Sequence, residues 1–263
     1  MAEFVGTENQ IAVQKRMRDR QSWIAETPGA VNGGRVMAFD DPGRVGWDRV
    51  TELANEDKLA VFPMFPESEI LDEIRNHLGP QWKTPSWQVY LGTPETVLPA
   101  CGAVIGDNPL PPGWRMAAYE GLDDRQVEAV QDLNTSTGVS PYPAFFMRGD
   151  AVPVLTACIS DDTGTLMATA SAAMRYHAES RLGGYVFAGM ASVSPDCRGR
   201  GLGKVINAYV LAASHARLGW TMAKEQVSAD NPVSQAMLTA CGLSRDEVCV
   251  SVAAINSEEG FTR

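Results

Sequence analysis

The sequence is poor in the residues that build metal sites and disulfide frameworks. It has 263 residues but only three histidines, which are scattered along the chain, so we expect no metal site. Its five cysteines are odd in number and widely spaced, with no CxxC pair. This pattern is typical of reduced thiols in the cytoplasm and not of a disulfide framework or a zinc site.

Long apolar runs and excess positive charge are also missing. No apolar run approaches the roughly 20 residues that a membrane span needs, and the acidic start, with Glu3 and Glu8, is unlike a secretory signal. The 32 acidic residues outnumber the 22 basic ones, for a net charge of −10. Because nucleic-acid phosphates require a basic face, we expect a cytoplasmic protein with neither a nucleic acid nor a membrane as its partner.

The remaining composition is that of an ordinary globular protein, with 44% apolar and 21% charged residues. The length allows one large domain or two small ones. Segment 108–113 holds three prolines and a glycine in six residues and is the candidate linker, because it resists regular structure. We therefore predict an N-terminal domain over residues 1–112 and a second domain over residues 113–263.

The most informative segment is a glycine-rich turn with three positive charges, at residues 193–204. It follows an apolar run of strand length, Tyr185–Val193, and precedes apolar residues with helical spacing. Glycine allows a ligand to approach the backbone closely, and the start of a helix offers free N–H groups and a positive dipole end. Arg198, Arg200 and Lys204 add positive charge. This combination predicts a pyrophosphate site.

The spacing within the turn decides which kind of phosphate site it is. A Walker A loop is excluded, because Arg198 stands at its first glycine and Val205 at its magnesium-binding hydroxyl. A Rossmann GxGxxG fails because Lys204 stands at the third glycine. The match is R-x-x-G-x-G, with Arg198, Gly201 and Gly203. A surface turn that binds nothing remains the alternative.

The turn and its surroundings resemble motif A of the GNAT superfamily of acyl-CoA-dependent N-acyltransferases. After it come a strand at 221–227 and a helix that begins at Asn231 and ends before Gly242 and Leu243, similar to the superfamily's second signature. The elements expected before it are a strand at 114–119, a helix at 123–133 and strands at 152–160 and 166–174. The resemblance covers about residues 114–255 and implies an α/β domain with a mixed central sheet flanked by helices.

The first 112 residues predict a smaller α/β domain before the GNAT-like one. Short strands are expected at 36–39, 59–62, 86–91 and 97–105, and a helix at 67–78. This region could be a degenerate second copy of the same fold. It contains no phosphate motif, so we assign it no cofactor and expect it to complete the acceptor pocket or to form an oligomer interface, such as that of a homodimer.

The resemblance implies acetyl-CoA as co-substrate and a set of residues that hold it. The amides of Ala191 and Val193 would pair with the pantetheine arm and polarise the thioester carbonyl, the turn would hold the pyrophosphate, and Asn231 would meet the pantetheine arm. The implied cofactor-binding residues are Ala191, Ser192, Val193, Arg198, Gly199, Arg200, Gly201, Leu202, Gly203, Lys204 and Asn231. Core packing is an alternative role for Ala191 and Val193, and helix capping for Asn231.

The sequence departs from the superfamily at the general acid. Many members have a tyrosine seven residues after the Asn, where this chain has Leu238. A thiol has a pKa of about 8.5, so the leaving thiolate can do without a dedicated acid. Otherwise the proton would come from water or from Cys241, Tyr209 or Tyr176.

The proton acceptor and the acceptor pocket are less constrained by the sequence. An ammonium substrate must lose a proton, and Glu225 and His177 are the candidate catalytic residues, with Glu179 a further one. Each could equally be a solvated surface residue. Tyr142, Phe145 and Phe146 are candidate walls of the acceptor pocket, with core packing as the alternative.

Two functions follow. The first is an acetyl-CoA-dependent N-acetyltransferase that acts on the amine of a small molecule or an amino acid. The second is a non-catalytic acyl-CoA-binding sensor, which Leu238 would permit. An acyl donor longer than acetyl is a further variant of the first.

Overall fold

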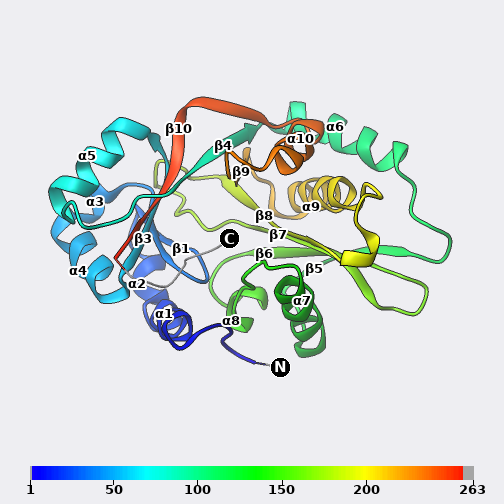
Figure 1. Ribbon diagram of the computed structural model, residues 1–263, viewed down its shortest axis with the longest axis horizontal. Helices are drawn as coiled ribbons and strands as arrows, with labels where there is room; N and C mark the ends of the chain where they lie inside the picture. The colour runs from blue at the N-terminus through cyan, green and yellow to red at the C-terminus, as the bar shows by residue number, and fades with distance from the viewer. Residues whose placement is uncertain (1, 257–263) are drawn as a thin grey trace.

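The computed structural model describes residues 2–256, and in this range it forms one ten-stranded sheet. The strands are β1 (Ala30–Asn32), β2 (Met37–Phe39), β3 (Leu59–Pro66), β4 (Ser86–Gly92), β5 (Arg115–Glu120), β6 (Val154–Ser160), β7 (Leu166–Ala173), β8 (Tyr185–Val193), β9 (Met222–Val227) and β10 (Ser244–Ile255). Their spatial order is β1-β2-β3-β10-β4-β9-β8-β7-β6-β5 (Figure 1). Parallel and antiparallel pairs both occur, so the predicted mixed α/β class is confirmed.

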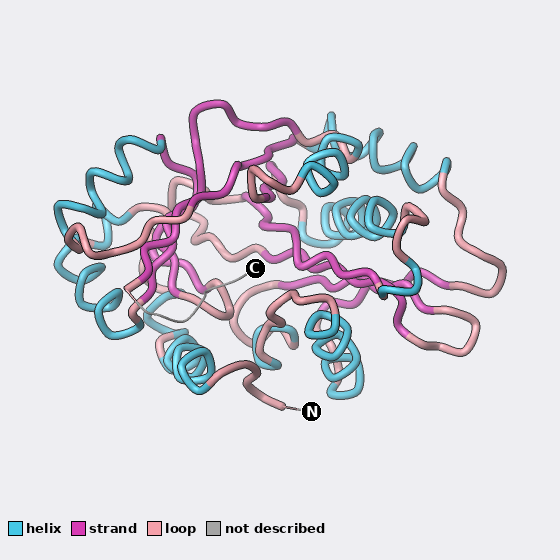
Figure 2. Tube along the Cα trace, in the orientation of Figure 1, coloured by secondary structure: helices cyan, strands magenta, loops and turns pink. Residues whose placement is uncertain are grey.

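Helices cover both faces of the sheet. They are α1 (Glu8–Asp19), α2 (Gln21–Ala25), α3 (Pro42–Val45), α4 (Trp47–Asp57), α5 (Glu67–His77), α6 (Pro94–Asp107), α7 (Asp124–Ser136), α8 (Ala144–Met147), α9 (Leu202–Leu218) and α10 (Pro232–Ala240). α6, α9 and α10 lie on one side of strands β5–β8, and α7 and α8 lie on the other (Figure 2). None of the helices in residues 2–256 is long and apolar enough to cross a membrane.

Local sequence explains where the helices near the turn begin and end. At the start of α7, Asp123 accepts a hydrogen bond from the N–H of Gln126, and the Gln126 side chain accepts one from the N–H of Asp123, which is a capping box. α9 ends at Gly219, whose φ of 65° is left-handed. The Asn231 side chain accepts from the N–H of Ser234 at the start of α10. These caps set the positions of the helices that carry the candidate site.

The two halves of the chain share an arrangement and exchange a strand. β2 and β3 are parallel and joined by α3 and α4, and β8 and β9 are parallel and joined by α9. Each pair is followed by one helix and one strand, α5 and β4 or α10 and β10. These last strands cross over: β4 pairs antiparallel with β9, and β10 pairs antiparallel with β3. In Figure 1 the red β10 accordingly lies beside the cyan β3.

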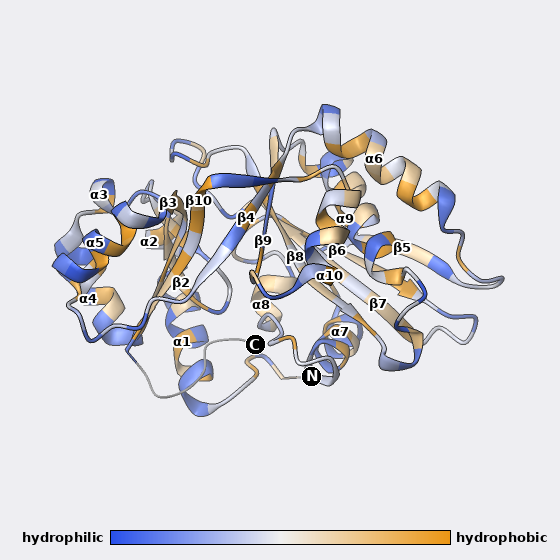
Figure 3. Ribbon diagram, turned by 45° about the horizontal axis from the view of Figure 1, so that its top comes forward, coloured by the Kyte–Doolittle hydropathy of each residue, from blue (hydrophilic) through white to orange (hydrophobic). Residues whose placement is uncertain are grey.

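Two buried clusters form the main core. One, the α9 cluster, lies between α6, α9, α10 and strands β6–β9 and includes the fully buried Trp220. The other joins α1, α4 and α5 to α7 and α8, so it spans both halves of the chain. Apolar residues are concentrated on the strands and on the inner faces of the helices (Figure 3). The sheet and the second cluster thus hold the two halves together.

Most elements expected from the sequence are present, with one clear error. Residues 97–105 were expected to form a strand but belong to α6, which begins with Pro94 in its first turn. The residues that pack in the α9 cluster recur at helical spacing: Val97, Cys101, Val104 and Ile105. The strand prediction rested on the apolar run as a whole and overlooked this helical period. α1 and α4 were not predicted. The domain boundary at 112/113 stays a prediction; one sheet runs across it.

The strand exchange predicts that residues 113–263 do not fold as an independent unit. Without β4, the edge of β9 at Ala223–Val227 loses its partner, and an unpaired strand edge favours aggregation. We expect the isolated segment to lack a cooperative thermal transition, and co-expression with residues 1–112 to restore it. Calorimetry of the segment alone and of the co-expressed pair measures this. A cooperative transition of the segment alone would contradict the prediction.

Candidate functional site

The glycine-rich turn connects β8 to α9 and exposes a row of backbone donors. Gly199 and Gly201 have φ values of 76° and 79°, the left-handed region that glycine tolerates. Within the described chain, the N–H groups of residues 199–203 donate to no backbone carbonyl, and Gly201 caps α9 without a side-chain hydrogen bond. Free donors at the positive end of a 17-residue helix form a site that suits phosphate.

The positive charges of the turn are available to a ligand. Arg198, Arg200 and Lys204 are exposed, and none of them belongs to an ion pair among residues 2–256. A Cβ atom added to Gly201 would lie 3.2 Å from Oδ1 of Asn108, so the proline-rich segment lies against the turn. The turn is therefore a positively charged surface in a protein of net charge −10.

β8 and β9 pair only at their beginnings and then diverge. The parallel pairing covers three positions and ends where Phe187 faces Lys224, although β8 continues to Val193 and β9 to Val227. β8 also has a bulge against β7, at which Met190 has a φ of 57°, and a bulge bends a strand. Beyond this point the ladder between β8 and β9 ends, so their facing backbone edges could pair with a ligand that adds strand-like hydrogen bonds.

The direction of the β8 amides follows from one hydrogen bond. The N–H of Ser194 donates to the carbonyl of Met167 in β7 at 2.8 Å. Because successive N–H groups of a strand point in opposite directions, those of Val193 and Ala191 point away from β7, toward the gap between β8 and β9. The hydroxyl of Ser192 accepts a hydrogen bond from Thr137 at the end of α7. Ser192 thus contacts α7 through its side chain.

α10 supplies two of the residues singled out in the sequence. The Asn231 side chain caps the helix, so at least its oxygen has a structural role. Leu238 is 2% exposed and lies in the α9 cluster, so this position offers no proton donor. Cys241, Tyr209 and Tyr176 remain the side-chain candidates for that role. The thiol of Cys241 is fully buried in the same cluster.

Glu225 lies under α9 and not in an open cleft. It is 3% exposed, and its carboxylate accepts a hydrogen bond of 2.9 Å from Asn207 of α9. Burial raises the pKa of Glu225 to about 7, against the opposing effect of the Asn207 hydrogen bond. A carboxyl group of this pKa suits general base catalysis, but its contacts lie on the α9 side of the sheet.

Lys224, which sequence reasoning missed, points to the opposite face. It is fully buried, and its Nζ lies 5.5 Å from the centroid of the Phe187 ring, where the β8–β9 pairing ends. Burial lowers the pKa of Lys224 well below its ordinary value, and the charges of Arg175 and Arg181 lower it further. Both effects shift Lys224 toward its uncharged form relative to an exposed lysine. The available signal was a lysine in the middle of a buried strand.

His177 and Glu179 lie in the segment that follows β7, in separate surroundings. Nδ1 of His177 accepts a hydrogen bond from the N–H of Glu179, and Glu179 pairs with Arg44 at the surface. His177 contributes to a second, smaller cavity of about 120 Å³ beside α2. Neither residue lines the larger cavity, and their predicted catalytic role stays a prediction.

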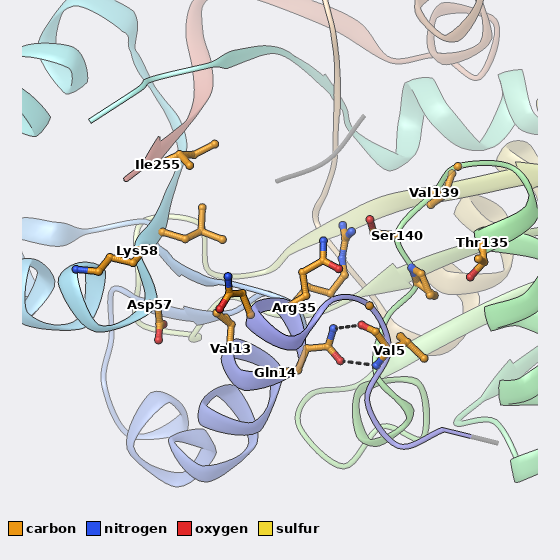
Figure 4. A pocket seen from close by; sticks show the side chains of 16 residues that line it. Val5, Val13, Gln14, Arg35, Asp57, Lys58, Thr135, Val139, Ser140 and Ile255 are labelled. Carbon is orange, nitrogen blue, oxygen red and sulfur yellow. Dashed lines mark hydrogen bonds between the residues drawn. The ribbon is translucent and has the colours of Figure 1, made fainter. Parts of the chain in front are cut away.

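The larger cavity, of about 310 Å³, lies between the two halves of the chain. Its lining comes from the start of α1, the end of α4, the end of β10 and the loop after α7 (Figure 4). Tyr142, Phe145 and Phe146, the expected pocket walls, are instead buried in the core at 3%, 2% and 0% exposure. The preceding loop residues 138–141 line the cavity in their place. Among residues 2–256 no cluster of side chains could hold a metal ion.

Comparisons with known proteins show which solved structures have a similar fold. No protein-family model matches the sequence, and no curated protein matches it. A GCN5-related N-acetyltransferase from Kribbella flavida matches with a TM-score of 0.57 at 14% identity, over 94% of this chain and 96% of that one. A tandem GNAT protein from the clavulanic acid biosynthesis pathway matches with 0.55 at 15%, over 87% and 78%. A GCN5-related N-acetyltransferase-like protein from Streptococcus suis matches with 0.51 at 16%, over 93% and 99%. The chain has the GNAT fold, as the sequence resemblance implied.

Glu225→Gln should be more stable than the parent protein, by an amount that depends on pH. The folded protein keeps a proton on Glu225 up to about pH 7, whereas the unfolded chain releases it at lower pH. The stability that this carboxyl contributes is therefore present at low pH and is lost as the pH rises through about 7. Glutamine stays neutral, so we expect a gain of about 3 kcal/mol in the free energy of unfolding at about pH 8 and almost none at about pH 4. Urea unfolding at both pH values measures the gain; a pH-independent difference would contradict it.

Proposed function

We propose that the protein is an N-acetyltransferase that transfers the acetyl group of acetyl-CoA to the amine of a small molecule or an amino acid, directly within a ternary complex. The observation that carries the proposal is the combination of free N–H donors at the start of α9 with the divergence of β8 from β9. The GNAT fold supports it. Localisation in the cytoplasm and the absence of a nucleic-acid partner stay predictions.

The residues of this region fit acetyl-CoA. The amides of residues 199–203, with Arg198, Arg200 and Lys204, would bind the pyrophosphate. The outward N–H groups of Ala191 and Val193 would pair with the pantetheine arm and stabilise negative charge on the thioester oxygen as the amine attacks. When bound, acetyl-CoA supplies an activated acyl group. The amine forms the new C–N bond, the C–S bond breaks, and the thiolate leaves.

Three side chains are candidates for accepting the proton of the amine, and they differ in position. Glu225 faces α9, and His177 lies beside the smaller cavity. Lys224 lies where the β8–β9 pairing ends, and its lowered pKa favours the neutral amine that a base requires. We therefore favour Lys224.

The sensor remains the second candidate function, because a specific observation favours it. Leu238 is apolar and buried at the position where many GNAT members have an acid. A thiolate leaving group tolerates this loss, so we rank the sensor below the enzyme. Acceptor-dependent turnover separates the two.

Acetyl-CoA should bind with micromolar affinity, and the turn should account for much of that affinity. In the double variant with Arg198→Ala and Arg200→Ala, we expect about 10- to 100-fold weaker binding, because charge-assisted hydrogen bonds to phosphate are lost. Isothermal titration calorimetry with acetyl-CoA, free CoA and a longer acyl-CoA measures this and ranks the donors. Arg49→Ala, at a half-buried arginine of α4 outside the turn, is the control. If the double variant binds acetyl-CoA with the affinity of the parent protein, the turn does not bind the pyrophosphate.

Sustained release of free CoA should depend on an added amine, which a sensor cannot produce. We expect Lys224→Met to lower kcat by about 100-fold or more, as loss of a general base does, and Glu225→Gln to have a much smaller effect. Thiol release across a pH series measures kcat for the parent protein and the two variants. Each of the three proteins is also checked for acetyl-CoA binding. A large loss in Glu225→Gln alone would assign the base to Glu225.

A further inference from the structure

The walls of the larger cavity are in contact with the part of β8 that lies beside the proposed thioester position, although no β8 residue lines the cavity itself. Arg35, which lines the cavity, has its Nη2 atom 3.6 Å from the Met190 sulfur, at the bulge of β8. On the opposite wall, the loop after α7 is held by the 2.9 Å hydrogen bond between Thr137 and Ser192 of β8. Two independent contacts therefore connect this cavity to β8 residues 190–192.

The charges that line the cavity do not balance. Among residues 2–256, the cationic residues of its lining are Arg35 and Lys58, and the one acidic residue is Asp57. The carboxylate of Asp57 is already paired with Arg16 and Arg20, at 2.6 Å and 2.7 Å. The paired Asp57 leaves the lining with a net positive charge, in a protein whose net charge is −10.

Arg35 is the charged group best placed to meet a ligand. Its side chain extends between Lys58 and Ile255 on one side and Val139 and Ser140 on the other (Figure 4). It belongs to none of the ion pairs in residues 2–256, and its buried Nε atom has no hydrogen-bond partner. A guanidinium carries five N–H donors in a planar fork, and an unsatisfied buried donor is costly.

Further basic residues lie inward of Arg35, and they do not neutralise its charge. Burial lowers the pKa of Arg35, and the charge of Arg175 lowers it further. Arg175 lies 3.6 Å from the Phe187 ring centroid, and its own Nε atom is also buried without a partner. The Nζ atom of Lys224 lies 5.5 Å from the centroid of the same Phe187 ring. Basic side chains, namely two guanidinium groups and the buried amine of Lys224, thus extend from the cavity to the end of the β8–β9 pairing.

We propose that the cavity binds the amine substrate and that Arg35 binds a carboxylate of that substrate, which makes the acceptor a small amino acid or a similar carboxylate-bearing amine. This inference rests on the proposed function. The planar fork of Arg35 matches a carboxylate in a bidentate pair. A volume of about 310 Å³ is at the small end of ligand pockets. The walls Val13, Leu59 and Ile255 suit an apolar side chain.

The test compares matched acceptors in matched variants. Acetyl transfer is measured, as release of free CoA, to the common L-amino acids, to their carboxamides and to the amines that lack the carboxyl group. We expect the best amino acid to exceed its carboxamide at least about tenfold in kcat/KM. Arg35→Gln should remove this preference through a KM increase of about 10- to 100-fold. Arg35→Lys should keep part of it, because charge remains without the fork, and Arg49→Gln should keep all of it.

Stability gives a second readout that a merely structural arginine would not show. Because Arg35 has no anionic partner in the part of the chain that the structure describes, we expect Arg35→Gln to keep or raise the Tm of the free protein. A structural role would lower the Tm. A variant that unfolds would therefore overturn the inference, as would equal turnover of carboxamides, a carboxylate preference that survives in Arg35→Gln, or transfer only to phosphate-bearing amines such as phosphoethanolamine.

The acetyl-CoA site is tested separately, so a failure of the inference about Arg35 can be distinguished from a failure of the proposed function. If acetyl-CoA binds in calorimetry but no carboxylate-bearing amine is acetylated, the inference about Arg35 is wrong and the donor site stands. If acetyl-CoA does not bind, the proposed function is wrong, and the inference about the acceptor fails with it.

Discussion

The candidate site depends on one constraint, the early end of the parallel pairing between β8 and β9. After Phe187 and Lys224 the two strands diverge, and their facing edges have backbone groups that no neighbouring strand satisfies. The far edge of β9 is paired with β4 from the other half of the chain, and the far edge of β8 is paired with β7. Because both strands are held from outside, the gap between them cannot close by ordinary sheet pairing. The glycine turn and α9 begin where β8 ends, which places N–H groups that suit a phosphate ligand beside these strand edges.

The charge distribution is the second organising feature. Acidic residues dominate the protein as a whole, yet Arg35 and Arg175 lie in its interior without carboxylate partners among residues 2–256. Burying a cation without a partner is expensive, and such an expense is typical of sites that a ligand completes. The exposed Arg198, Arg200 and Lys204 form a separate positive group at the turn. Two positive regions, one on the surface and one inside, therefore suit two anionic groups on two different ligands.

Sequence reasoning succeeded where local signals are strong and failed where they conflict. Most elements of residues 114–240 were predicted, though not α8, because they combine a clear period with a glycine, proline or Asn near one end. Residues 97–105 were misread because an almost unbroken apolar run satisfies both periods, and only packing against α9 shows which residues share a face. α1 was missed because polar and charged residues together outnumber its apolar ones, although Thr7 and Gln10 form a capping box there. Arg35 was missed for a different reason: nothing near it in the sequence indicates a cavity.

By itself, the sequence determined the strand, the turn and the helix of the candidate phosphate site, because glycine conformations, helix ends and positive charges act over a few residues. Only the tertiary structure decided that β4 and β10 are exchanged between the halves, since strand partners distant in the chain have no local signature. It also decided the surroundings of two neighbouring residues, Lys224 and Glu225. Successive side chains of a strand point to opposite faces, and both faces of β9 are buried. The sequence could therefore show that the two differ, but not which one lies beneath α9.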